Sequence, residues 1–112
     1  MKKLHTINNP LRQELNPFDI IKIVEIFYCI NQGALVSSKR GKRRIAYARA
    51  VAMYLVRELT NYSFPDIADH FKRDHSTVIK AYYRVKQQIQ GTTNLVLQDT
   101  IAYLQEQIPT LI

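Results

Sequence analysis

The chain has 112 residues, with 16 Lys plus Arg against 9 Asp plus Glu, one cysteine and no tryptophan. Its length fits one domain with short tails, and an apolar content of 46% excludes a disordered chain. The net charge of +7 indicates a polyanionic partner.

The basic excess is concentrated in two short blocks. Residues 39–49 carry six basic and no acidic side chains, and residues 72–86 carry a net charge of +4. The rest of the chain sums to −3. A charge placed in this way predicts two contact regions for a nucleic acid rather than a diffusely basic surface.

Several classes of protein are excluded by the same sequence. The longest apolar stretch, residues 18–30, is too short to span a bilayer and contains Lys22 and Glu25. Residues 1–5 lack the apolar core of a signal peptide, so we expect a cytoplasmic protein with no membrane partner. The three glycines are scattered and form no phosphate loop, and the three histidines lack metal-like spacing. We therefore expect no bound nucleotide, no cofactor, no metal and no enzymatic activity.

The first helix is predicted over residues 17–30. Residues 1–15 show no sustained period and are expected to form a flexible arm, so the folded domain is expected over residues 16–108. Asn16 is a typical N-cap, and Gly33 suits the end of the helix. The lone Cys29 is expected to be a small core residue. Apolar spacing predicts one buried face, made of Ile20, Ile23, Val24, Phe27 and Ile30.

Apolar residues three and four apart predict two further long helices, at about residues 46–60 and 95–108. Pro109 is expected to stop the second of them. No strand pattern competes with these helices. The expected fold class is therefore all-α, a compact helical domain.

Residues 63–90 have the outline of a helix-turn-helix. Ser63 is the N-cap candidate of a short helix ending near Phe71, and Asp74 is the N-cap candidate of a longer helix that Gly91 ends. In such motifs the second helix enters the major groove with its N-terminal residues on the base edges. The candidate major-groove residues are Asp74, His75, Ser76, Thr77 and, one turn later, Lys80.

Each of these side chains has chemistry suited to a base edge. His75 can donate to a purine acceptor, Asp74 can accept from a cytosine amino group, and the Thr77 methyl can contact a thymine methyl. Phosphate contacts are expected from Lys72, Arg73 and Arg84. The basic loop is expected to reach the minor groove through Lys39, Arg40, Lys42, Arg43 and Arg44.

Two stretches, residues 52–61 (AMYLVRELTN) and 71–82 (FKRDHSTVIKAY), resemble a known family. They are similar to the C-terminal DNA-binding domain (domain IV) of the bacterial replication initiator DnaA, and the similarity extends over about residues 17–108. The resemblance implies a DnaA C-terminal, Trp repressor-like helix-turn-helix. It implies binding of double-stranded DNA at a replication origin, or regulation of replication initiation.

The resemblance also implies roles for individual residues. Arg73 joins the major-groove residues, Arg43 is the basic-loop residue expected in the minor groove, and Arg49 and Arg57 are expected to hold phosphates. One departure is a turn that is one residue shorter. The family usually has Phe-Gly-Gly-Arg-Asp-His, and this chain has Phe-Lys-Arg-Asp-His at residues 71–75.

A second departure is that the sequence contains no P-loop, so we expect a stand-alone homologue of the domain rather than an ATPase. Two functional classes remain open. One is a sequence-specific DNA-binding module in replication control. The other is a transcriptional regulator or nucleic-acid adaptor, including one associated with a mobile element or with RNA. In that class the helix over residues 95–108 is available for a replication or regulatory protein partner.

Overall fold

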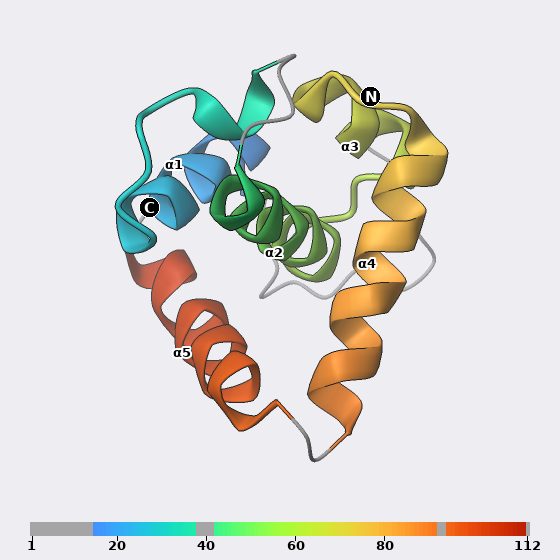
Figure 1. Ribbon diagram of the computed structural model, residues 1–112. Helices are drawn as coiled ribbons and strands as arrows, with labels where there is room; N and C mark the ends of the chain where they lie inside the picture. The colour runs from blue at the N-terminus through green and yellow to red at the C-terminus, as the bar shows by residue number, and fades with distance from the viewer. Residues whose placement is uncertain (1–14, 38–41, 92–93, 112) are drawn as a thin grey trace.

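The structure, a computed structural model, describes residues 15–37, 42–91 and 94–111 (Figure 1). Within these ranges the chain is helical and contains no strand, which confirms the all-α expectation. The predicted N-terminal arm lies almost entirely outside the described residues. The elements are α1 (Pro17–Phe27), the short 3₁₀-helix η2 (Ala34–Val36), α2 (Arg43–Leu59), α3 (Phe64–Phe71), α4 (His75–Gln90) and α5 (Leu95–Leu111).

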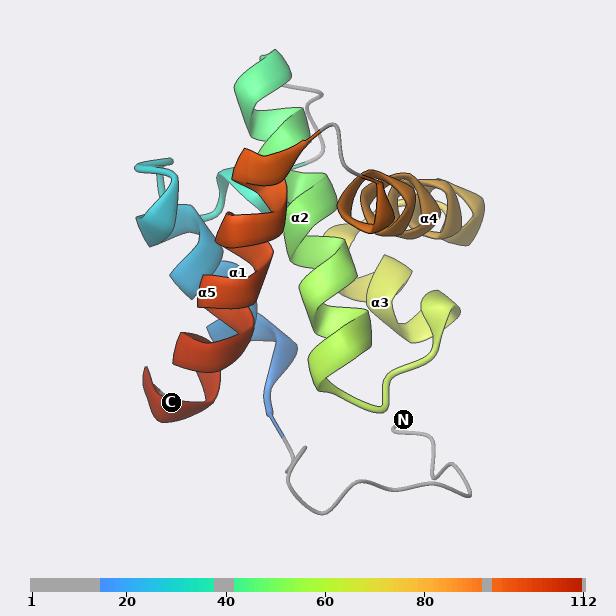
Figure 2. The same ribbon diagram turned by 90° about the horizontal axis from the view of Figure 1, so that it is seen from below.

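Helix α2 is the centre of the fold. Every residue from Ala48 to Val56 is buried, and α2 contacts each of the other elements. Figure 2 shows α1 and α5 on one side of α2 and α3 and α4 on the other. Since α2 is covered all round along its middle turns, its basic N-terminal turn is left as its exposed end.

The predicted helix-turn-helix is formed by α3 and α4. The Ser63 hydroxyl accepts from the Asp66 N–H at 3.3 Å, and the Asp74 carboxylate accepts from the Ser76 N–H at 3.1 Å. Both residues are therefore the N-caps that the sequence predicts. Between them, the turn of residues 72–74 redirects the chain.

Lys72 makes this turn possible by adopting a left-handed conformation, with φ 56° and ψ 44°. The Arg73 N–H donates to the Ala68 carbonyl at 3.0 Å, and the Lys72 N–H donates to the Asp69 carbonyl at 3.4 Å. This pair of bonds is a Schellman motif, which usually has glycine at the left-handed position. The shortened turn therefore closes α3 without the glycines that the family carries there.

Aromatic side chains fix α4 against α2 and α3. The rings of Tyr54 and Tyr82 stack with centroids 5.2 Å apart, and Phe64 meets Tyr82 edge-on at 5.4 Å. The Tyr82 hydroxyl donates to Glu58 of α2. Burial and this carboxylate raise the Tyr82 pKa well above its usual range, so the hydroxyl stays protonated and keeps donating.

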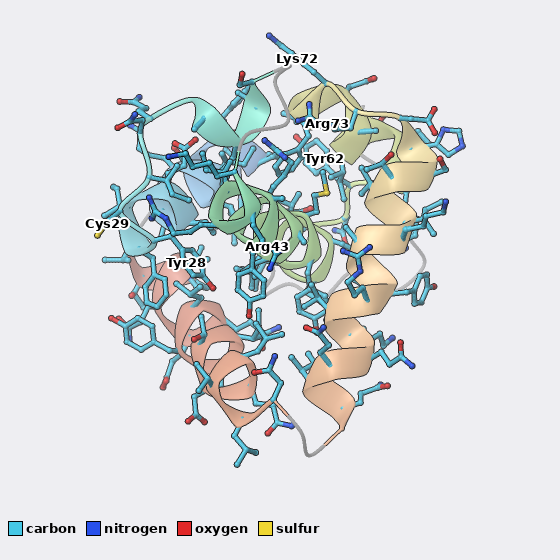
Figure 3. All side chains as sticks on the ribbon, viewed as in Figure 1. Tyr28, Cys29, Arg43, Tyr62, Lys72 and Arg73 are labelled. Atoms are coloured by element: carbon cyan, nitrogen blue, oxygen red, sulfur yellow. The ribbon has the colours of Figure 1, made fainter. Side chains whose placement is uncertain are left out.

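The end of α1 differs from the prediction. The helix stops at Phe27 rather than Ile30 because Cys29 is left-handed, with φ 56°. The Ile30 N–H donates to the Glu25 carbonyl at 2.8 Å in a second Schellman motif. Cys29 is consequently exposed, not a core residue, and its side chain points outward at the edge of the molecule (Figure 3). Phe27, expected to be buried, is 41% exposed, and Gly33 does not end α1 but precedes η2.

Two other helix bounds were wrong. Helix α2 begins at Arg43 rather than near Ala46, so part of the predicted basic loop is its first turn. Helix α5 continues through Pro109 to Leu111. Proline near a helix end removes one N–H bond of the last turn, and the Thr110 hydroxyl supports that turn by donating to the Gln107 carbonyl at 2.7 Å. No helix in the described part of the chain is long and apolar enough to cross a membrane.

The left-handed turn gives a stability prediction. Replacing Lys72 by glycine should raise the free energy of unfolding by about 0.5–1 kcal/mol, because glycine adopts this conformation without a steric cost. Urea unfolding monitored by circular dichroism measures the change. The matched control is Gln87→Gly in the exposed interior of α4, which should lower stability. A loss of stability in Lys72→Gly would show that the left-handed conformation of Lys72 has no steric cost.

Candidate nucleic-acid interface

The start of α4 presents a continuous row of exposed polar side chains. Asp74, His75, Ser76 and Thr77 are all exposed, and Lys80 is exposed one turn later. On the opposite side of the same turns, Val78 and Ala81 are buried against the core. The structure therefore brings these five predicted residues together on one surface.

Asp74 and Ser76 are bonded to each other within this row. The Asp74 carboxylate accepts from both the N–H and the hydroxyl of Ser76. These two bonds, with smaller effects from the nearby His75 and Lys80 charges, lower the Asp74 pKa below its usual range. The carboxylate is thus held charged at the positive end of α4, where it stabilises the helix.

A groove of about 230 Å³ lies beside this row, between α2 and α4. Its apolar lining residues are Ala46, Ala50, Met53 and Ala81, and its polar lining residues are Arg49, Arg73, Thr77, Lys80 and Arg84. Four of the lining side chains are cationic and none is acidic. The groove therefore gathers cations from α2, from the turn before α4 and from α4 itself.

The Arg49 and Arg73 guanidinium groups are close enough to affect each other. Burial and, secondarily, the charge of Arg73 lower the pKa of Arg49 from its usual value. Arginine nevertheless remains charged at neutral pH. Like charges gathered in a partly enclosed groove favour an anion between them, and guanidinium groups bind phosphate oxygens through paired N–H donors.

The second basic block lies at the N-terminus of α2. Lys42 is the N-cap residue and Arg43 and Arg44 form the first turn, with all three exposed. The Arg44 Nη1 donates to the Tyr28 carbonyl at 2.7 Å, which ties this turn to the end of α1. Figure 3 shows Arg43 in front of α2, on the face seen there. Lys39 and Arg40 lie outside the described residues.

The predicted phosphate residues fall into two groups. Lys72 and Arg84 are exposed, and the Lys72 side chain projects from the turn at the edge of the molecule (Figure 3). Arg49 is buried and Arg57 half-buried, and both donate to backbone carbonyls. Arg57 bonds the Tyr62 carbonyl at 2.9 Å and lies over the Phe64 ring at 4.5 Å. Their phosphate contacts stay predictions.

One contributor was missed by the sequence reasoning, the buried carboxylate of Glu25. It accepts from the backbone N–H of Gly33 and Leu35, just before the basic block. Its position four residues after Ile21 and one after Val24, on the buried face of α1, was the signal that could have found it. No group of three His, Cys, Asp or Glu that could hold a metal occurs in the part of the chain that the structure describes.

A family model described as "Bacterial dnaA protein helix-turn-helix" matches residues 17–85 of the chain. The chain belongs to this family. The match covers α1 to α4 up to Val85, so it includes every lining residue of the groove and both basic blocks except Lys86. The resemblance to the DnaA C-terminal domain is confirmed.

Individual relatives agree with this assignment to the DnaA helix-turn-helix family. The chain is 44% identical over 61 residues to the chromosomal replication initiator protein DnaA of Caldanaerobacter subterraneus subsp. tengcongensis, covering 54% of this chain and 14% of the relative. It is 48% identical over 52 residues to the proteins of the same name from Thermoanaerobacter sp. strain X514 and Thermoanaerobacter pseudethanolicus, covering 46% of this chain and 12% of each relative. The chain thus spans about a seventh or less of the length of these relatives.

The Asp74 cap predicts a pH dependence of stability. A carboxyl group whose folded-state pKa is depressed contributes stability above its unfolded pKa of 3.8 and loses it as the pH falls through the lower folded value. As the pH falls below about 4, the free energy of unfolding should therefore decrease less steeply in Asp74→Asn than in the wild-type chain. Asparagine keeps a capping oxygen but does not titrate. Guanidinium unfolding between pH 2.5 and 6 measures both slopes. Equal slopes would show that Asp74 is not held charged.

Proposed function

We propose that the chain binds double-stranded DNA in a sequence-specific manner, with α4 in the major groove and the basic segment at residues 39–44 in the adjacent minor groove. The observation that carries the proposal is the groove between α2 and α4, whose four cations lie beside the exposed first turn of α4. A backbone phosphate in this groove would place that turn against the base edges. The family of the chain supports the same arrangement.

The biological target follows from the relatives. They are named chromosomal replication initiator proteins, so we propose that the chain recognises an origin sequence or acts in the control of replication initiation. The chain covers 14% of the first of these proteins, and the family model that it matches is that of the helix-turn-helix. Its proposed contribution is therefore DNA recognition.

The capping bonds restrict what the first turn of α4 can read. The Ser76 hydroxyl donates to Asp74, so towards DNA it offers an acceptor. Asp74 is held charged and also accepts. Both therefore favour the amino groups of adenine or cytosine. His75 and Thr77 add a donor for a purine and a methyl for thymine, which gives the turn a mixed and asymmetric preference.

Selection of bound duplexes from a random pool at physiological salt tests the proposal. We expect recovery of one enriched asymmetric motif, since a single α4 reads one short site. An RNA duplex of the same sequence should compete poorly, because the A-form major groove is too narrow for a helix. Failure to retain any duplex, or equal competition by RNA, would exclude major-groove reading by α4.

The base-reading residues can be tested one at a time. His75→Ala and Thr77→Ala should each weaken binding to the selected site by about 1–3 kcal/mol and relax the preference at one base pair. Gln87→Ala, exposed three turns further along α4, is the control and should change neither quantity. If the affinities for selected and random duplexes fall equally, these side chains contact the DNA backbone and not the base edges.

The phosphate residues predict a different signature. Arg84→Ala removes one cation of the groove and should weaken selected and random duplexes by the same factor, while reducing the salt slope of binding by about 1. Fluorescence anisotropy over a series of salt concentrations measures both. An unchanged slope would place the phosphate outside this groove.

A further inference from the structure

Two buried ionic side chains hold the short segment that precedes the basic block. Glu25 of α1 is 3% exposed and Arg49 of α2 is 7% exposed. The Glu25 Oε2 accepts from the N–H of Gly33 at 2.9 Å and from the N–H of Leu35 at 3.2 Å. The segment around η2 is thus bonded to a carboxylate through its backbone donors.

Arg49 binds the same segment through its backbone acceptors. Its Nε donates to the Leu35 carbonyl at 2.9 Å, and its Nη2 donates to the Ala34 carbonyl at 3.4 Å. The peptide groups of residues 33–35 are therefore fixed from α1 by an anion and from α2 by a cation. Leu35, whose side chain is fully buried, donates its N–H to Glu25 and accepts at its carbonyl from Arg49.

This arrangement is costly if stability is its only result. Buried ionic groups have large desolvation penalties, and apolar residues of similar volume are often as stable or more so. What directed hydrogen bonds add is a defined position for the groups they bind. Gly33 allows the segment to take this path, since it has φ 90°, a conformation that glycine adopts without steric cost.

The held segment and the cations at the N-terminal end of α2 are both bonded to α1. Helix η2 ends at Val36, and Lys42 begins the basic turn of α2. The first turn of α2 is also bonded to α1 directly. Its Arg44 donates to the Tyr28 carbonyl, at the end of the helix that carries Glu25. The N-terminal end of α2 is therefore held to α1 at two places, through η2 and through Arg44.

We propose that Glu25, with Arg49, is a positioning residue for DNA binding, which bonds α1 and α2 together through η2 and so fixes where Lys42, Arg43 and Arg44, at the N-terminal end of α2, meet the duplex. The inference rests on the proposed function. According to this inference, part of the DNA affinity depends on a carboxylate that does not contact DNA. The negative charge of that carboxylate would by itself repel the DNA.

The sign of the effect makes the test sharp. Glu25→Ala and Glu106→Ala each remove one negative charge, and Glu106 is an exposed residue of α5 outside the interface. Loss of a negative charge alone should slightly strengthen binding, as expected for Glu106→Ala. We expect Glu25→Ala instead to weaken binding of the selected duplex about tenfold and to reduce the salt slope by about 1–2. An affinity equal to that of Glu106→Ala would overturn the proposal.

A double-mutant cycle separates positioning from general damage. In a background that carries Lys42→Ala and Arg43→Ala, two of the three cations are gone and the third, Arg44, is bonded to the Tyr28 carbonyl, so Glu25→Ala should cost less than twofold. The base preference measured by selection should stay unchanged in Glu25→Ala, because α4 keeps its own contacts. A tenfold loss in both backgrounds, or a relaxed base preference, would overturn the proposal.

Two variants guard against a protein that does not fold. Glu25→Gln keeps an acceptor oxygen for both N–H groups and should retain most of the affinity. Gly33→Ala disturbs the same segment through φ alone and should show the salt-slope loss of Glu25→Ala in a chain that remains folded by circular dichroism. Normal binding by Gly33→Ala overturns the positioning role. Absence of duplex binding by the wild-type chain instead overturns the proposed function, and the inference with it.

Discussion

The burial of α2 on all sides is the constraint on which the rest of the structure depends. Nine consecutive residues of α2, all apolar or small except Arg49 and Tyr54, are buried by α1, η2, α3, α4 and α5 together. On the interface side, the N-terminal end of α2 reaches solvent and carries Lys42, Arg43 and Arg44. The position of the basic block is therefore a consequence of core packing.

Packing on α2 also places α4. The groove between the two helices is lined by the small side chains of Ala46, Ala50 and Ala81, and the stacked rings of Tyr54 and Tyr82 join the same two helices. The groove between the helices thus opens beside the first turn of α4. Cations from α2, from the turn and from α4 converge there because the backbones that carry them are fixed by apolar contacts.

The sequence predicted the helices and their N-caps because these depend on local chemistry. Apolar spacing located the core of α2 and α4, and Ser63 and Asp74 cap the helices as expected. The exits of helices were harder, since Cys29 and Lys72 take a left-handed conformation that their residue types do not indicate. Backbone hydrogen bonds of Schellman type, formed in the folded chain, decide these positions.

The interface was predictable in its composition but not in its internal bonds. The exposed row from Asp74 to Thr77 follows from the cap and the helical period. The burial of Arg49 and Glu25 depends instead on where η2 packs, and three residues of 3₁₀-helix leave no periodic signal. A cation in a basic block looks like a DNA contact in sequence, and only the tertiary structure shows that Arg49 binds two carbonyls of its own chain.

Cys29 and Lys72, both left-handed, end two helices in the same way. Each ends a helix with the same pair of backbone bonds, and each sends the chain towards an element of the interface, η2 with the basic block after Cys29 and α4 after Lys72. A Schellman motif needs only one left-handed residue, so the turn can lose a residue and still deliver Asp74 as the cap of α4. The shortened turn therefore preserves the helix-turn-helix and places a lysine, Lys72, where the family usually has glycine, at the edge of the surface proposed to meet DNA.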